Sequence, residues 1–312
     1  MFRVRDHMYK IREPGSGGPG RVVFALAGGG NLGAVQVGML TALLEAGITP
    51  DAIIGSSVGA INGAFVAGHA DLAGMEQLAQ LWTNTRRQKV FPLNVGGIAL
   101  GLLGRRQFLF ESFGLRDLLA RAEFGFSNIE EAPIEFNVVA TDMNTTEVVV
   151  IDRGGTVEAI LASSAIPGVF PPVEIEGRAL VDGGVLENVP VIEAERFAPS
   201  TIYVLPTQLE VIERPPSGAF GTFQRAMSMA GQPATRMALA DVSMRRNVKV
   251  LPVPQIAGQL SVFDFKETPR LIEESYLMSK QWLEQHHATE AVYRDAVVFD
   301  DSSTYQERSV SA

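Results

Sequence analysis

Short apolar runs alternate with longer amphipathic stretches along most of this chain. Runs rich in Val, Ile and Leu are typical of buried strands, and apolar residues spaced three and four apart are typical of helices. Residues 21–27 predict the first strand, and residues 34–46 predict the helix after it, which Gly47 ends. This alternation predicts a parallel sheet with helices packed on its faces.

The same patterns predict the remaining elements. Further strands are expected at 51–54, 134–140, 147–151, 178–181, 201–205 and 248–252. Further helices are expected at 58–68, 72–85, 114–123, 156–163, 190–196, 222–244 and 268–287. Strands and helices continue on both sides of the proline-containing loop at 215–218, and there is no internal repeat. We therefore expect one α/β domain over residues 21–300, a three-layer sandwich with a mainly parallel central sheet and helices on both faces.

Both ends of the chain are polar. Residues 1–20 finish in a Gly- and Pro-rich run and lack the apolar core of a signal peptide, which predicts a flexible arm. Residues 301–312 predict a frayed tail. Since no apolar run approaches the roughly 20 residues that span a bilayer, we expect a cytoplasmic protein, with peripheral contact as its form of membrane association.

The composition narrows the function. A net charge of −9 argues against nucleic acid as a partner, because phosphate binding needs a basic surface. The chain has no cysteine, which excludes disulfides and thiolate chemistry. Its four histidines lack zinc-site spacing, so we expect no metal and no cofactor. Nothing in the composition indicates the oligomeric state.

The pentapeptide Gly55-Ser-Ser-Val-Gly59 lies between a predicted strand and a helix rich in small residues. A serine hydroxyl can attack a carbonyl only if it stands clear of the backbone and has a base nearby. A tight strand-to-helix turn exposes it, and Gly55 and Gly59 remove side chains that would collide there. The pattern predicts Ser57 as a nucleophile, against the alternative of a structural Gly/Ser turn.

The run Gly28-Gly-Gly-Asn-Leu-Gly33 precedes the helix at 34–46. Glycine lets successive N–H groups point at one spot, so Gly29 and Gly30 could donate to an oxyanion, with Gly28 and Gly33 shaping the loop. The same spacing matches the dinucleotide-binding fingerprint, whose second strand ends in an acidic residue. Here that strand ends in serines, and Asp51 lies at its start. The oxyanion role is therefore favoured over nucleotide binding or a plain turn.

A base for Ser57 has to come from elsewhere in the chain. Asp182 follows the apolar run 178–181 and precedes two glycines, which places a carboxylate at the end of a strand. The ends of parallel strands are where such sheets gather their active sites. Taken alone, these residues favour the interpretation as a plain Asp-Gly turn.

Four motifs in order resemble the patatin-like phospholipase family. They are the glycine run 28–33, the elbow 55–59, Ala162-Ser-Ser-Ala-Ile-Pro167 with Phe170 and Pro171, and Asp182-Gly-Gly-Val-Leu-Glu-Asn-Val-Pro190; Thr141-Asp142 is also similar to that family. The resemblance covers residues 21 to 205, about two thirds of the chain. It implies the patatin-like fold and a Ser-Asp dyad, in which Ser57 attacks, Asp182 is the base, and the N–H groups of Gly29 and Gly30 form the oxyanion hole.

Leu32 departs from the family pattern, in which this position usually carries Arg or Lys. That difference weakens the case for a phospholipid headgroup more than the case for ester hydrolysis, because backbone donors stabilise most of the oxyanion charge. A histidine triad is an alternative, since His286 and His287 follow Ser57 and Asp182 in the order of α/β-hydrolases. Both histidines fall at the end of a predicted helix, where a simple electrostatic role explains them, as it does for His69.

Two segments have alternative interpretations. Residues 90–103 are apolar and flanked by Arg and Lys, and aromatic residues follow up to Phe113. The segment 90–113 is therefore typical of a lid or membrane-facing flap, or else of a buried loop that caps the core. Met227, Met229, Met237 and Met244 lie on one predicted helix, where core packing is favoured over the lining of an acyl pocket.

The sequence thus predicts a serine acyl hydrolase that cleaves carboxylic esters of lipids (phospholipid, lysophospholipid or acylglycerol) and contacts membranes transiently. The alternatives are a nucleotide-binding oxidoreductase that uses the glycine loop and a catalytically silent lipid-binding protein. The headgroup, the acyl length and the acyl acceptor are not specified by the sequence.

Overall fold

The computed structural model describes residues 20–91, 107–208, 218–255 and 265–298. Their core is an eight-stranded sheet in the order β5-β6-β3-β2-β1-β7-β8, with β4 paired to β3. The strands are β1 (Val22–Leu26), β2 (Ala52–Ser56), β3 (Glu135–Asp142), β4 (Glu147–Ile151), β5 (Val173–Ile175), β6 (Arg178–Asp182), β7 (Thr201–Leu205) and β8 (Asn247–Val250).

Five neighbouring strands, from β3 through β2, β1 and β7 to β8, run parallel. The other three strands are antiparallel to their neighbours: β4 and β6 pair with β3, and β5 pairs with β6. The mainly parallel sheet that the sequence predicts is therefore confirmed. The direction of β6 decides how Asp182 reaches Ser57.

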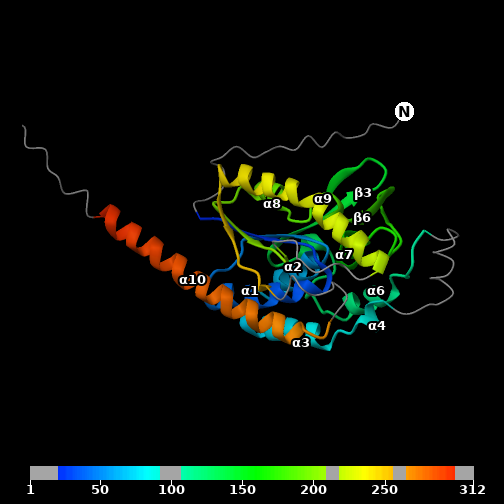
Figure 1. Cartoon of the computed structure of the whole chain (residues 1–312), viewed down its shortest axis with the longest axis horizontal. Helices are drawn as coiled ribbons and strands as arrows, with labels where there is room; N and C mark the ends of the chain where they lie inside the picture. Colours follow the sequence, from blue (N-terminus) through cyan, green and yellow to red (C-terminus); the bar gives the residue numbers. More distant parts are fainter. Residues whose placement is uncertain (1–19, 92–106, 209–217, 256–264, 299–312) are drawn as a thin grey trace, which may run out of the picture.

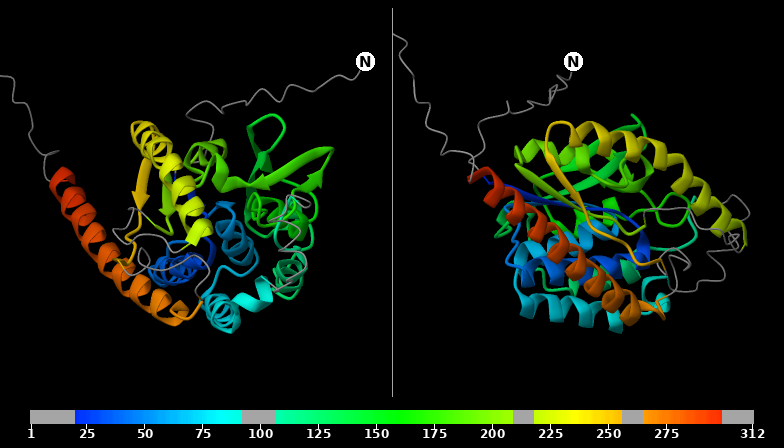
Figure 2. Two further views of the ribbon diagram at one scale, coloured as in Figure 1. Left: turned by 45° about the vertical axis from the view of Figure 1, so that its right-hand side comes forward. Right: turned by 60° about the vertical axis from the view of Figure 1, so that its left-hand side comes forward.

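Both faces of the sheet are covered by helices (Figures 1 and 2). Helices α8 and α9 lie on one face, while α1, α3 and α10 lie on the other, with α10 packed along α1. The helices are α1 (Ala34–Glu45), α2 (Val58–Gly68), α3 (Leu72–Asn84), α4 (Arg87–Val90), α6 (Phe113–Ala120), α7 (Thr156–Ser163), α8 (Val191–Ala194), α9 (Gly218–Ser243) and α10 (Thr268–Val298). The three-layer α/β architecture is confirmed.

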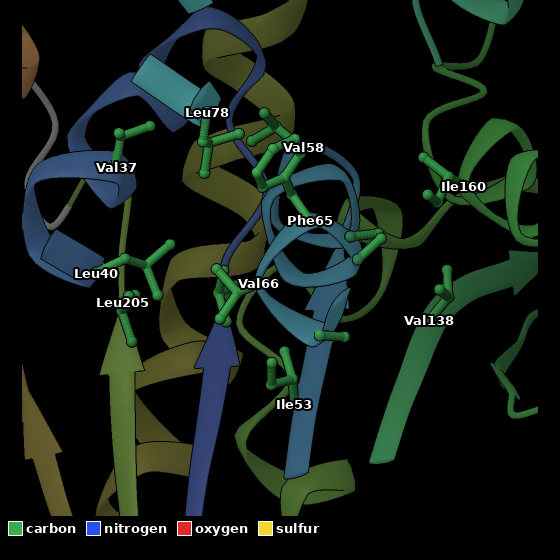
Figure 3. Close-up of a cluster of buried hydrophobic side chains, with 14 of the residues drawn as sticks. Val37, Leu40, Ile53, Val58, Phe65, Val66, Leu78, Val138, Ile160 and Leu205 are labelled. Carbon is green, nitrogen blue, oxygen red and sulfur yellow. The ribbon is translucent and has the colours of Figure 1, made fainter. Parts of the chain in front are cut away.

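Two apolar clusters, one on each face, hold the layers together. Successive residues of a strand point to opposite faces, so Phe24 and Leu26 join the cluster under α1 and α2, whereas Val23 joins the cluster under α9. Figure 3 shows part of the larger cluster, to which α1 contributes Leu40 and β2 contributes Ile53. Because both faces are buried, the central strand β1 is apolar from Val22 to Leu26 without interruption.

Several boundaries differ from the predicted ones. The predicted helix 190–196 is a single turn, α8, followed by a 3₁₀ turn over Glu195–Phe197. The last helix continues to Val298, eleven residues beyond the predicted end, and β5 and α4 were not predicted. These two elements are three and four residues long, too short for a periodic pattern to form. The terminal segments 1–19 and 301–312 lie outside the described residues.

Three of the four methionines of this segment do not pack in the core. Met229, Met237 and Met244 are among the exposed large apolar side chains, so the prediction of core packing is wrong for these three. Met229 and Met237 lie along the outer side of α9, opposite Ala238 and Val242, which pack on the sheet, and Met244 directly follows the helix. The side chain of Met227 lies outside the described residues.

The segment 90–113 is described only at its two ends, and residues 92–106 lie outside the described part. Phe91 is buried and stacks on Phe170, and the backbone N–H of Phe110 donates to the carbonyl of Val169. Phe113, at the start of α6, is 71% exposed. The described ends therefore combine a buried anchor with an exposed aromatic side chain. None of the helices in the described ranges is long and apolar enough to cross a bilayer.

Candidate active site

Ser57 occupies a strained backbone position between β2 and α2. Its φ and ψ are 52° and −121°, outside the regions that a residue with a side chain normally adopts. Such a conformation costs about 1–3 kcal/mol and persists only where the surroundings enforce it. It turns the serine out of the strand at the N-terminus of α2, as a nucleophile elbow requires.

The two glycines of the elbow are needed because backbones approach there closely. A Cβ on Gly55 would overlap the carbonyl group of Gly59 in the first turn of α2. A Cβ on Gly59 would overlap the carbonyl oxygen of Leu26 at the end of β1. The helix can therefore start directly above the sheet only with glycine at both positions.

The hydroxyl of Ser57 donates a hydrogen bond of 2.7 Å to Oδ2 of Asp182. The register of the strands explains why Ser57 and Asp182 lie side by side. Ser56 pairs with Val139 of β3, and Asp182 pairs with Ala140, the next residue of the same strand. Ser57 and Asp182 thus flank β3 at one level of the sheet. The expectation that Asp182 ends a parallel strand was wrong, because β6 runs antiparallel to β3 and returns the carboxylate to that level.

Both side chains are 7% exposed. Oδ1 of Asp182 accepts a 2.7 Å hydrogen bond from the N–H of Gly184, which leaves Oδ2 for the serine. Burial raises the pKa of Asp182 from 3.8 to about 6, although the hydrogen bonds from Ser57 and Gly184 oppose the shift. A carboxylate with such a pKa is ionised at neutral pH and is basic enough to accept a proton.

The glycine loop passes beside the dyad. A Cβ on Gly28 would lie 3.2 Å from Cβ of Ser57, so the loop and Ser57 are neighbours. Gly29 and Gly30 both have positive φ, 156° and 59°, which turns the backbone as an N–H nest requires. The hydrogen bonds found between described residues use neither of these two N–H groups. Both donors are thus available to a ligand.

Buried hydrogen bonds fix this loop from behind. The hydroxyl of Thr207 donates to the carbonyl of Gly28, whose own N–H donates to the carbonyl of Asn188. The amide of Gln36, which is fully buried, donates to the carbonyl oxygens of Ala27 and Leu205. The sequence analysis did not identify these contacts, since their partners are far apart in the chain.

Asn62 extends the support toward the start of α1. Its Nδ2 donates to the carbonyl of Gly33 and to Oε1 of Gln36, and its Oδ1 accepts from the indole N–H of Trp82. A buried amide in an apolar helix is the signal that could have revealed this network, because such groups are almost always hydrogen-bonded.

The last residue of α7 and the segment after it contact Ser57 and Asp182. The backbone N–H of Ser57 donates to Oγ of Ser163, at 2.7 Å, and Oγ of Ser163 donates to the carbonyl of Val139, at 2.6 Å. The N–H of Asp182 donates to the carbonyl of Ala165, at 3.0 Å. Ser163 lies in the motif 162–167, to which the sequence analysis assigned no role.

The other described residues that the sequence analysis considered for the site make no hydrogen bond with Ser57 or Asp182 through their side chains. Asp51 accepts from the N–H of Val22 at the opposite edge of the sheet, so it cannot meet a ligand at the glycine loop. Leu32 is buried in the core and brings no charge to the site. His69 and His286 contact carbonyls of Glu123 and Trp282, and neither hydrogen-bonds to the dyad.

The side chain of His287 lies outside the described residues. Within the described ranges, no three His, Cys, Asp or Glu side chains are grouped as a metal ion would need. Ser57 bonds directly to Asp182, which leaves no place for an imidazole between them. Elbow, buried carboxylate and N–H nest together form the arrangement expected of a serine acyl hydrolase.

Comparison with known proteins gives the family. The family model described as patatin-like phospholipase matches residues 24–195, more than half of the chain. The chain belongs to this family, and the resemblance inferred from the four motifs is confirmed.

Two relatives indicate how the chain compares with larger proteins. An uncharacterized NTE family protein of Mycobacterium tuberculosis is 36% identical over 184 residues, which are 58% of this chain and 47% of that protein. Lysophospholipase nte1 of Aspergillus terreus is 31% identical over 185 residues, 59% of this chain and 12% of the fungal protein. The solved structure of VipD from Legionella pneumophila covers 86% of this chain and 67% of its own, with 16% identity and a TM-score of 0.46. The chain thus matches less than half of the length of the mycobacterial and fungal relatives.

Proposed function

We propose that the protein is a serine acyl hydrolase that cleaves carboxylic esters of lipids through an acyl intermediate on Ser57. The observation that carries this proposal is the 2.7 Å hydrogen bond from Oγ of Ser57, held in a strained elbow, to the buried carboxylate of Asp182. The name of the family and that of the fungal relative, a lysophospholipase, favour lipid esters as substrates.

In the first half-reaction, Oγ of Ser57 attacks the carbonyl carbon of the ester and its proton moves to Oδ2 of Asp182. The carbonyl oxygen becomes an oxyanion, which the N–H groups of Gly29 and Gly30 stabilise together with the positive end of α1. When the tetrahedral intermediate collapses, the C–O bond to the alcohol breaks. The departing alkoxide takes the proton from Asp182 and leaves as the alcohol.

In the second half-reaction, water attacks the acyl carbon and gives its proton to Asp182. The bond between the acyl carbon and Oγ of Ser57 then breaks, the serine recovers the proton, and a free fatty acid is released. A single carboxylate serves as base and acid in turn. Its pKa of about 6 lies near neutrality, where both roles are accessible.

Leu32 bears on the expected substrate range. Its side chain is uncharged and buried, so this position offers no cation to a phosphate. We therefore expect ester hydrolysis to depend little on a phosphate headgroup. Phospholipids, lysophospholipids and acylglycerols are all candidates. Because the proposed substrates are lipid esters, transient contact with a lipid surface is part of the same proposal.

The test uses a serine-directed phosphonate and intact-mass analysis, with hydrolysis of a short-chain ester measured in parallel. Wild type should gain one phosphonyl group and Ser57→Ala none, with loss of esterase activity of roughly 10⁴-fold or more. Asp182→Asn should be labelled slowly. Ser56→Ala is the matched control, because Ser56 is fully buried and its hydroxyl makes no hydrogen bond with the described residues.

Other results would point elsewhere. Full activity in Ser57→Ala would contradict the proposal, and full labelling rate in Asp182→Asn would remove the carboxylate from its role. Fatty-acid binding without any labelling of wild type would identify a silent lipid-binding protein. Protection against heat by a dinucleotide, again without labelling, would favour the nucleotide-binding alternative.

A further inference from the structure

Ser163 contacts the nucleophile through its backbone. It is the last residue of α7 and is fully buried. Its hydroxyl accepts from the N–H of Ser57 and donates to the carbonyl of Val139. One side chain thus satisfies two main-chain groups, one in the residue after β2 and one in β3.

These two groups lie where the next rung of the sheet would form. Val139 is the register partner of Ser56, the last residue of β2, and Ser57 is the residue that would continue the ladder. Ser57 cannot continue it, because its positive φ turns the chain into α2. The hydroxyl of Ser163 bridges the resulting gap, so the N–H of Ser57 stays paired although the strand has ended.

The same short segment also fixes the base. Two residues after Ser163, the carbonyl of Ala165 accepts from the N–H of Asp182. The hydroxyl of Ser163 and the carbonyl of Ala165 therefore bind the backbones of Ser57 and Asp182, respectively.

We propose that Ser163 is a positioning residue, whose hydroxyl fixes the backbone of Ser57 and keeps its Oγ on the carboxylate of Asp182. This inference rests on the proposed dyad. It also assigns the N–H of Ser57 to Ser163, so that this group does not serve the oxyanion, which is left to Gly29 and Gly30. Without the hydroxyl, a buried N–H and a buried carbonyl lose their partner, and the elbow relaxes toward an ordinary backbone conformation.

The test compares Ser163→Ala, Ser163→Cys and Ser163→Thr with wild type in the full chain. The measurements are kcat and KM for a short-chain ester, the rate of phosphonate labelling of Ser57 and the midpoint of thermal unfolding. Ser163→Ala should lower kcat and the labelling rate together, roughly 10- to 100-fold, with KM nearly unchanged, because a misplaced nucleophile slows acylation without weakening substrate binding.

Rescue separates positioning from simple stability. Threonine keeps the hydroxyl and should restore most of the labelling rate, whereas cysteine keeps the size of serine but bonds weakly and should not. Ser164→Ala is the matched control. Ser164 is also buried, and its hydroxyl makes no hydrogen bond among the described residues, so this variant should retain the wild-type rate.

Three outcomes would overturn the inference. One is a wild-type kcat in folded Ser163→Ala, measured well below its unfolding midpoint. Another is equal labelling rates in the Ser163→Cys and Ser163→Thr variants. This comparison still tests the inference if Ser163→Ala does not fold. A third is a loss of rate in Ser164→Ala as large as that in Ser163→Ala. If Ser57→Ala abolishes activity while Ser163→Ala does not, only the positioning role fails; if Ser57→Ala stays active, the proposed function fails as well.

Discussion

Ser57 and Asp182 meet across β3, at a donor–acceptor distance of 2.7 Å and a separation of 125 residues in the chain. Each is fixed by main-chain pairing on its own side of that strand: Ser56 pairs with Val139 and Asp182 with Ala140. The geometry of the dyad is therefore a property of the sheet register. A one-residue slip of β6 would move the carboxylate to the other face.

The first prediction concerns the pH dependence of the acylation rate. Asp182 has to be ionised to accept the serine proton, and burial raises its pKa to about 6. We expect kcat/KM to be constant above about pH 7 and to fall about tenfold per unit below pH 6. The measurement is hydrolysis of a neutral ester from pH 4.5 to 8.5, with folding monitored by circular dichroism. Phosphonate labelling should follow the same profile, and a rate independent of pH between about 5 and 7 would contradict the assignment.

The second prediction concerns stability and follows from the same pKa. In the unfolded chain Asp182 titrates near 3.8, so between 3.8 and about 6 the folded state holds a proton that the unfolded state has lost. The free energy of unfolding therefore falls as the pH rises through this window, and the burial of the charge is fully unfavourable above it. Asp182→Asn should be more stable than wild type by about 1–3 kcal/mol at pH 8. The difference in stability should nearly vanish at pH 4. Urea unfolding of both proteins at pH 4 and pH 8 measures this difference, and the same difference at the two pH values would contradict the prediction.

The third prediction concerns the elbow glycines. Gly59→Ala would place a methyl group against the carbonyl of Leu26, and moving α2 away from β1 should cost roughly 2–4 kcal/mol of unfolding free energy. Gly231→Ala is the control, because a Cβ there meets nothing within 4 Å and α9 gains helix propensity. That variant should be stabilised by about 0.5–1 kcal/mol. Similar unfolding midpoints for both variants would show that α2 does not need this close approach.

The fourth prediction concerns the support of the glycine loop. Thr207→Val removes the hydroxyl that donates to the carbonyl of Gly28, and we expect kcat to fall several-fold as the N–H nest loosens, with a loss of about 1–3 kcal/mol in stability. Thr85→Val is the matched control, since Thr85 is equally buried and donates to the carbonyl of Leu81 in α3. It should lose comparable stability but keep kcat. Equal kcat values in the two variants would show that the hydrogen bond of Thr207 does not affect the catalytic rate.

The local chemistry of the site could be predicted from the sequence. Ser57 was identified because an elbow is encoded within five residues, by glycines on either side of a serine between a strand and a helix. The glycine run was recognisable for the same reason, since its turn depends on residues next to one another. Apolar periodicity predicted the parallel core, because strands buried on both faces and amphipathic helices each leave a local pattern.

The partners of these residues could not be predicted in the same way. Asp182 was a candidate, but its position beside Ser57 depends on the antiparallel pairing of β6 with β3, which no local pattern encodes. Ser163, Thr207 and Gln36 contact backbone groups far away in the chain, and nothing in their own neighbourhoods specifies those partners.

The sequence by itself determined the class of fold and predicted Ser57 as the nucleophile and the glycine loop beside it. Those features depend on backbone conformations that neighbouring residues dictate. Only the tertiary structure decided which carboxylate atom accepts the hydrogen bond of Ser57 and which hydroxyl fixes the backbone of Ser57. Both depend on the register and direction of strands, which form through contacts between distant segments when the whole sheet assembles.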